Sequence, residues 1–250
     1  MIEKNALIEI AKLRGLKAWQ EEKRYIQASI LNSLYDESIV FKGDTYLWFF
    51  NGLPRFSEDL DFTAISDLPS NIMNKVSERL DLFGIYNESK IETNDKKSFS
   101  FKVMAQGPLY TSQNSRCVVY VEISKREELI NKTLPIKLNF PEYLLPIHVL
   151  NGINLDEVGA EKIRAITSRN KARDVLDLYY LIKEKNIKFD INLVNKKLEY
   201  IGDRFLPDKF EISLLNKRGI FEKELKNLLF VPLPEFDEVR SVIEKWTKII

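Results

Sequence analysis

The sequence predicts an α/β (α+β) fold, in which a mixed sheet with flanking helices is followed by a C-terminal helical bundle. Up to about residue 150, short apolar or alternating segments typical of strands are interspersed with helical periodicity. From Leu155 onward, helical periodicity dominates. We therefore expect two domains, residues 1–152 with the sheet and residues 153–250 with the helical bundle.

Composition excludes several classes of protein. The 250 residues, of which 44% are hydrophobic, are enough to bury a sizeable core. A formal net charge of +1 gives no global field that would indicate a nucleic-acid or membrane partner. One cysteine, Cys117, and one histidine, His148, exclude an intramolecular disulfide and most zinc sites, and we expect both residues to be structural. No apolar run approaches the roughly 18 residues that span a bilayer, so we expect a cytoplasmic protein without a membrane partner.

Periodicity and turn residues define the expected elements. In the first part, the expected helices are two within residues 2–34, broken near Gly15 or Lys17, then residues 45–50, and residues 71–83 with Ser70 as N-cap. The expected strands are residues 38–41, 59–65, 98–103 and 117–123, and a further short apolar segment spans residues 144–149. In the second part, we expect helices at residues 155–167, 173–185, 193–200, 221–229 and 236–250.

The stretch from Phe41 to Phe62, FKGDTYLWFFNGLPRFSEDLDF, has the strongest chemical character. Gly43 opens a helix, where backbone N–H groups and the helix dipole favour a phosphate, although an ordinary turn is the simpler alternative. Asp59 and Asp61 are two apart on an expected strand, so their side chains point to the same face. Such a pair suits Mg²⁺, which prefers carboxylate oxygens together with substrate phosphates. The alternative is a solvated edge strand whose acids discourage pairing.

The same stretch resembles a signature of the AbiEii/AbiGii-type toxins, a branch of the DNA-polymerase-β-like minimal nucleotidyltransferases. Members of this family read roughly FKGGTxLxxxYGLPRFSEDLDF. The later segment EKIRAITSRNKARDVLDLYYLI is similar to the family's second block, with its lysine and its RDxxDLY run. The two blocks come in the expected order, and the resemblance covers about residues 20 to 185. It implies a nucleotidyltransferase fold for the sheet domain.

The resemblance also implies a reaction, the transfer of a nucleoside monophosphate from an NTP to an acceptor hydroxyl with release of pyrophosphate. The acids that match Asp59 and Asp61 bind Mg²⁺ in that family, and Mn²⁺ is an alternative. Gly43 and the hydroxyl of Ser57 match positions close to the phosphates. Arg55 is a further candidate for phosphate contact, although it can equally pair with Glu58 or Asp59 and order the loop.

Residues elsewhere in the chain complete the implied site. Polymerase-β-like sites usually have a third carboxylate, for which Glu122 is the best candidate, since its neighbours Val121 and Ile123 would face the core. The alternative is a surface glutamate. Lys162 and Asp174 match the family's functional lysine and aspartate. Their alternatives are a surface lysine and an acid favoured by the helix dipole. Five basic residues, Lys162, Arg164, Arg169, Lys171 and Arg173, would attract a triphosphate or an RNA backbone.

The resemblance further implies a toxin with a cognate antitoxin, an NTP as donor, and the 3′ end of tRNA or another RNA as acceptor. One residue departs from the family pattern, because Asp44 stands where the family has glycine or serine. Asp44 can cap the helix that follows, but it also adds negative charge beside the expected phosphates. It favours the rival hypothesis, a catalytically silent protein of the same fold that binds RNA or a protein partner.

Overall fold

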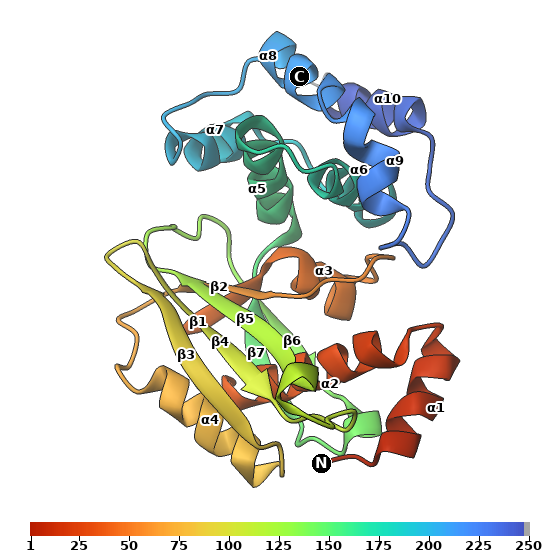
Figure 1. The fold of residues 1–250 in the computed structure, drawn as a ribbon. Helices are drawn as coiled ribbons and strands as arrows, with labels where there is room; N and C mark the ends of the chain where they lie inside the picture. The colour runs from red at the N-terminus through yellow and green to blue at the C-terminus, as the bar shows by residue number, and fades with distance from the viewer. Residues whose placement is uncertain (248–250) are drawn as a thin grey trace. The chain divides into compact units, whose positions relative to one another are not determined.

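A computed structural model of the chain describes residues 1–247. Contacts within it divide the chain into two compact units (Figure 1). The first unit consists of Met1–Phe50, Ser57–Leu129 and Thr133–Gly152. The second consists of Asn51–Phe56, Ile130–Lys132 and the chain from Ile153 onward. The segment Asn51–Phe56 thus belongs to the second unit, although it lies inside the stretch FKGDTYLWFFNGLPRFSEDLDF.

The first unit is built on a seven-stranded mixed sheet with the order β3-β4-β5-β2-β1-β7-β6. Its strands are β1 (Ile39–Lys42), β2 (Leu60–Ala64), β3 (Asn87–Asn94), β4 (Ser98–Ala105), β5 (Cys117–Ser124), β6 (Leu134–Leu138) and β7 (His148–Gly152). The β1/β7 and β2/β5 pairs are parallel and the other pairs are antiparallel. The predicted fold class, a mixed sheet with flanking helices, is confirmed.

Helices of the first unit cover the apolar face of this sheet. They are α1 (Lys4–Arg14), α2 (Ala18–Ser33), α3 (Gly43–Asn51, whose last residue belongs to the second unit) and α4 (Ile72–Leu82). Alternate residues of β4 and β5, such as Phe101 and Val121, are fully buried, and α2 contacts β5 while α4 contacts β3 (Figure 1). Gly15 ends α1 in a left-handed conformation, which confirms the predicted break between the first two helices.

The second unit is helical. Its helices are α5 (Leu155–Ser168), α6 (Arg173–Lys185), α7 (Ile191–Glu199), α8 (Pro207–Leu215), α9 (Arg218–Leu225) and α10 (Phe236–Thr247). Helix α5 packs against α6, α7 and α8, and α6 packs against α10. The Asn51–Phe56 segment joins this unit through backbone hydrogen bonds, since Phe56 N–H donates to Leu228 O and Phe230 N–H donates to Pro54 O, both at 2.9 Å. The predicted helix at residues 236–250 begins as expected, and its last three residues lie outside the described part.

The sequence pattern does not indicate strands β3 and β6 or helix α8. Strand β3, NESKIETN, lies at one end of the sheet and is largely exposed, so it lacks the apolar alternation that marks a strand. Strand β6, LPIKL, is at the other end of the sheet and contains Pro135, which argues against a strand except at an edge. Helix α8 begins with Pro207 at its first turn, where proline is tolerated.

Some predicted boundaries are also corrected. The apolar segment at residues 144–149 is mostly loop, because Leu144 is 86% exposed with a left-handed backbone (φ 56°), and β7 starts only at His148. Asn71 rather than Ser70 occupies the N-cap position of α4, without a side-chain capping hydrogen bond. Helix α9 begins and ends earlier than the predicted residues 221–229. These shifts are of the size expected when tertiary packing decides where an element ends.

Gly152 at the end of β7 is predicted to resist any larger residue. A Cβ at this position would lie 2.6 Å from Cε2 of Tyr46, a buried ring of α3 that also packs against Phe41. We expect Gly152→Ala to lower the free energy of unfolding by about 1–3 kcal/mol through overpacking, measured by chemical denaturation. The control is Gly219→Ala in α9, where nothing lies within 4 Å and alanine favours the helix. Equal stability of Gly152→Ala and the unmutated protein would contradict this packing.

Candidate active site

A row of charged side chains crosses adjacent strands on the polar face of the sheet. Asp61 of β2 is directly opposite Lys42 of β1 on one side and Glu122 of β5 on the other. Residues directly opposite in neighbouring strands share a face, so all three side chains project from the same side of the sheet. The next residues along two of these strands, Phe62 and Ile123, are buried on the opposite face. The strand register therefore brings Asp61 and Glu122 together, as the sequence pattern predicted for one face.

Asp59 lies one residue before β2, at the end of a loop held by buried polar contacts. Thr45 of α3 donates from Oγ1 to the carbonyl oxygen of Asp59 at 2.5 Å, and the same Oγ1 lies 2.8 Å from Oγ of Ser57. Gln27 of α2 donates to the carbonyl oxygen of Ser57 at 3.2 Å. The Asp59 side chain is exposed, while Ser57 is buried with its hydroxyl beside Thr45. Thr45 and Gln27 were not predicted, and only their contacts in the fold single them out.

Gly43 is held in a conformation that other residues rarely adopt. Its φ is +74°, and a Cβ at this position would lie 2.3 Å from Oδ2 of Asp61. The carboxylate of Asp61 thus rests against the α-carbon of the glycine that begins α3. The sequence reading assigned Gly43 to a phosphate turn. The structure adds a second requirement for glycine here, which is room for the Asp61 carboxylate.

Burial of the Asp61 carboxylate and repulsion from neighbouring carboxylates determine the electrostatics of this site. Burial, together with the negative charges of Asp44, Glu122 and Asp59, raises the pKa of Asp61 to about 7, while Lys42 opposes them. Lys42 is itself buried and paired with Glu127. Oxygen donors that repel one another in this way fit a hard divalent cation, because the cation would neutralise them. Asp61 and Glu122, opposite one another, and Asp59, one residue before β2, are therefore candidate ligands for such an ion.

In the second unit, the predicted residues Lys162 and Asp174 lie in a buried ionic cluster. Lys162 Nζ of α5 lies 3.0 Å from Oδ1 of Asp174 and 2.5 Å from Oδ2 of Asp177, both on α6. Asp174 also accepts two hydrogen bonds from Arg169, at 2.7 and 2.8 Å. Lys162 is therefore not a surface lysine, and Asp174 is not a solvated acid at a helix end. These were the alternative interpretations of the two residues. Asp177 was not predicted as a site residue, although its spacing of three from Asp174 places both on one helix face.

Arg55 belongs to the same cluster, with a partner that the sequence did not indicate. Its guanidinium is 1% exposed and binds Asp177 through two hydrogen bonds of 2.6 Å, from Nε to Oδ1 and from Nη2 to Oδ2. The sequence reading proposed Glu58 or Asp59 as partners, the nearest acids along the chain. Glu58 instead pairs with Lys23 at 3.0 Å. A contact between Arg55 and a phosphate stays a prediction.

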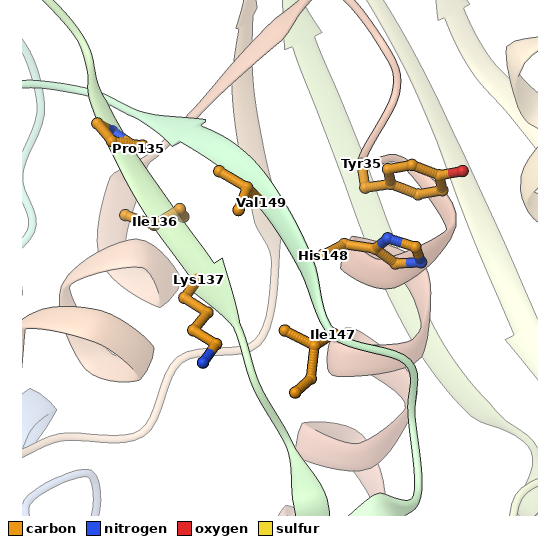
Figure 2. A pocket seen from close by; sticks show the side chains of 7 residues that line it. All are labelled: Tyr35, Pro135, Ile136, Lys137, Ile147, His148 and Val149. Carbon is orange, nitrogen blue, oxygen red and sulfur yellow. The ribbon is translucent and has the colours of Figure 1, made fainter.

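A pocket of the first unit lies beside β6 and β7 and contains none of the predicted site residues (Figure 2). It has a volume of about 500 Å³ and is lined by Tyr35, Pro135, Ile136, Lys137, Ile147, His148 and Val149. His148 stacks on Tyr35 with ring centroids 3.6 Å apart and planes 4° apart. Elsewhere in the first unit, burial raises the pKa of the Cys117 thiol to about 12, so Cys117 stays protonated at neutral pH. Both residues have the packing environments expected of structural residues.

Comparison with known proteins identifies the family. The model of the family described as "Nucleotidyl transferase AbiEii toxin, Type IV TA system" matches residues 24–249. The chain belongs to this AbiEii family. It is therefore a nucleotidyltransferase of a toxin–antitoxin system, with an NTP as substrate and an antitoxin as partner. The resemblance found in the two sequence blocks is confirmed.

Two solved structures share the fold of this chain. JHP933 from Helicobacter pylori is 21% identical with a TM-score of 0.65, over 93% of this chain and 91% of that one. MenT4, a nucleotidyltransferase toxin from Mycobacterium tuberculosis H37Rv, is 21% identical with a TM-score of 0.66, over 99% of this chain and 89% of that one. At this identity the likeness shows the fold alone. Comparison with curated proteins finds no match. Within residues 1–247, no helix is long and apolar enough to cross a bilayer.

Gly43→Ala is expected to lower nucleotidyl transfer by at least about 100-fold, because the added methyl group displaces the Asp61 carboxylate. Incorporation of radiolabelled nucleotide measures the effect. The matched control is Gly15→Ala, since Gly15 has a similar φ of +67° but nothing within 4 Å. Both variants bear the backbone strain of a left-handed alanine, and only Gly43→Ala meets Asp61. Equal activity of the two variants would contradict the steric role of Gly43.

Asp61→Asn is expected to stabilise the metal-free protein above pH 7. The folded pKa of Asp61 is about 7 against an ordinary value of 3.8, so ionisation of this group opposes folding as the pH rises between these values. Removing the charge should raise the free energy of unfolding by on the order of 4 kcal/mol at pH 8, with little gain near pH 4. Chemical denaturation in a chelator at both pH values measures this. A gain that is the same at both values would contradict the assigned electrostatics.

Proposed function

We propose that this AbiEii-family enzyme transfers a nucleoside monophosphate from an NTP to a hydroxyl at the 3′ end of tRNA, with Mg²⁺ held by Asp59, Asp61 and Glu122. Mn²⁺ is an alternative ion. The observation that carries this proposal is the direct pairing of Asp61 with Glu122 across β2 and β5. It gathers carboxylates whose mutual repulsion favours a divalent cation. The proposed catalytic domain is the sheet unit, residues 1–152 without Asn51–Phe56 and Ile130–Lys132. The helical unit is the proposed second domain.

Each residue of the sheet unit has a distinct task in the proposed reaction. When bound, the ion would neutralise charge on the triphosphate and on the attacking oxygen. Asp61 and Glu122 would fix where that charge is neutralised, because β2 and β5, which carry them, are paired, and Asp59 lies one residue before β2. Gly43 and the first amides of α3 would bind phosphate oxygens at the positive end of the helix dipole. Ser57, beside Thr45, is proposed to lie close to the phosphates.

The helical unit is proposed to supply positive charge. Lys162 would bind the triphosphate, and Asp174 would fix Lys162, with which it already forms an ion pair. The loop between α5 and α6 carries Arg169 and Lys171, both exposed. Basic side chains on an exposed loop favour contact with a phosphate backbone, which supports an RNA acceptor. We place the enzyme and its antitoxin in the cytoplasm.

The alternative is a protein of this fold that binds RNA or a partner protein without catalysis. Asp44 favours this alternative, because it adds a fourth carboxylate whose charge raises the pKa of Asp61. In the proposed enzyme, bound Mg²⁺ would offset this charge. Binding without catalysis requires that RNA is bound but no nucleotide is transferred to it.

The two hypotheses are separated by incubating the protein with Mg²⁺, each radiolabelled NTP in turn, and pooled tRNA. We expect labelled tRNA in the presence of at least one NTP, and loss of labelling by about 100-fold or more in Asp59→Ala and in Glu122→Gln. The control variant is Asp67→Asn, which changes an exposed acid of the same unit outside the carboxylate row. Labelling that is absent from the unmutated protein, or equal in all variants, would refute the proposed enzyme.

A further inference from the structure

Asp177 lies at the centre of the buried ionic cluster of the second unit and has no role in the proposed reaction so far. Its two carboxylate oxygens accept hydrogen bonds from Arg55 at 2.6 Å each, and Oδ2 also lies 2.5 Å from Nζ of Lys162. The side chains of Asp177 and Arg55 are 0% and 1% exposed, and that of Lys162 is 6% exposed. A single carboxylate therefore joins two buried cations.

These contacts connect the two sequence blocks on which the family resemblance rests. Arg55 comes from the first block, in the Asn51–Phe56 segment that belongs to the second unit. Asp177 and Lys162 come from the second block, on α6 and α5. Helix α6 presents Asp174 and Asp177 from one face because they are three residues apart. The ion pair between Arg55 and Asp177 thus anchors the first block to the helix that fixes the functional lysine.

The geometry makes Asp177 the stronger of the two anchors of Lys162. The carboxylate of Asp174 is shared with Arg169, which binds both of its oxygens, and Asp174 lies 3.0 Å from Nζ. Asp177 lies nearer, at 2.5 Å. Arg55 donates a hydrogen bond to each carboxylate oxygen of Asp177. A planar bidentate pair of this kind fixes the orientation of a carboxylate. The position of Nζ is therefore determined by a carboxylate that cannot rotate.

The charges of the cluster lead to the same conclusion. Three cations, Arg55, Lys162 and Arg169, are in contact with two anions, Asp174 and Asp177. Without the charge of Asp177, the two most deeply buried of these cations would lose a shared counterion. A buried cation without its counterion is destabilised, and a lysine responds by losing its proton. An arginine does not lose its proton, because its pKa is too high.

We propose that Asp177 is a positioning residue for nucleotide binding, which holds the Lys162 ammonium in place and is itself held by Arg55. The proposal rests on the proposed function in one respect, the binding of the triphosphate by Lys162. Asp177 does not touch the substrate. It acts by keeping Lys162 charged and fixed in one orientation.

Other charged groups surround the helices that carry this cluster. On α5 and α7, Lys197 is buried between Glu157 at 2.6 Å and Glu161 at 3.2 Å. Between α8 and α9, Lys217 is buried, and its pKa is lowered by burial although Asp174 attracts its charge. Asp177→Asn leaves these groups unchanged. A change in the titration of Lys162 in this variant is therefore attributable to the lost carboxylate.

The test compares the unmutated protein with Asp177→Asn, which keeps the size of the side chain and removes its charge. Because the charged form of a lysine exists below its pKa, a lowered pKa means that the charge is lost at lower pH. We expect the pKa of Lys162, followed by NMR of ¹⁵N-labelled lysine, to fall by about one unit or more. The pH at which KM for NTP begins to rise should fall by the same amount, relative to the unmutated protein. kcat should change less than KM.

The variant Asp177→Asn with Lys162→Arg provides the rescue. Arginine keeps its charge at pH 9, so the rise in KM with pH should disappear in the double variant. Arg55→Lys, which keeps the charge but loses the bidentate pair, should move KM in the same direction as Asp177→Asn by a smaller factor, and it replaces Asp177→Asn if that variant does not fold. The control for loss of an ion pair is Asp203→Asn, which removes an exposed pair with Lys209 in the same unit.

The outcomes separate this inference from the proposed function. If Asp177→Asn lowers only the midpoint of unfolding, and both the pKa of Lys162 and the pH profile of KM are unchanged, Asp177 is structural and the inference is wrong. If the pKa of Lys162 falls but the unmutated protein binds no NTP, the anchoring of Lys162 stands and the proposed function fails. A fall in pKa together with the pH-dependent rise in KM supports both.

Discussion

Repulsion between carboxylates on one face of the sheet is the constraint on which the first unit depends. Asp61 and Glu122 are opposite one another because β2 and β5 are parallel and in fixed register. A slip of one residue in either strand would turn its acid into the core and bring its buried neighbour, Phe62 or Ile123, to the polar face, so the buried face enforces the register. The apolar core thus holds together charges that would otherwise separate.

The surroundings of the row show how the protein tolerates this repulsion. Lys42 lies opposite Asp61 and is paired with Glu127, which places one buried cation at the end of the row. Gly43 leaves room for the Asp61 carboxylate where any side chain would meet it. The raised pKa of Asp61 shows that compensation by Lys42 is incomplete. A site whose negative charge is not fully compensated gains stability when a cation binds to it. A fold can favour metal binding in this way.

The second unit, in contrast, buries positive charge. Arg55, Lys162 and Arg169 form ion pairs with two aspartates of α6. A buried cation needs a counterion with good geometry, and the bidentate pair of Arg55 with Asp177 supplies it. Since the strongest contacts of Lys162 are to α6, the register of α5 against α6 decides where its ammonium lies.

The sequence predicted local features well and long-range partners poorly. The alternation of polar and apolar residues around Asp61 and Glu122 was sufficient to predict that these two acids share a polar strand face, because strand periodicity is a local property. Asp59 lies outside the strand, one residue before β2. The partner of Arg55 could not be predicted, since Asp177 is distant in sequence and the nearer acids Glu58 and Asp59 were equally plausible. Strands β3 and β6 were not predicted, for a related reason. Their pairing partners stabilise them, while their own exposed residues carry no strand pattern.

Electron paramagnetic resonance of Mn²⁺ tests the proposed ion site most directly, because it reports free and bound ion without requiring turnover. The titration uses the unmutated protein, Asp61→Asn and Glu122→Gln, each with a non-hydrolysable NTP analogue. If the carboxylate row binds the ion, the unmutated protein binds Mn²⁺ and both variants bind it at least about tenfold more weakly. Equal binding of Mn²⁺ by all three proteins would show that the ion lies elsewhere.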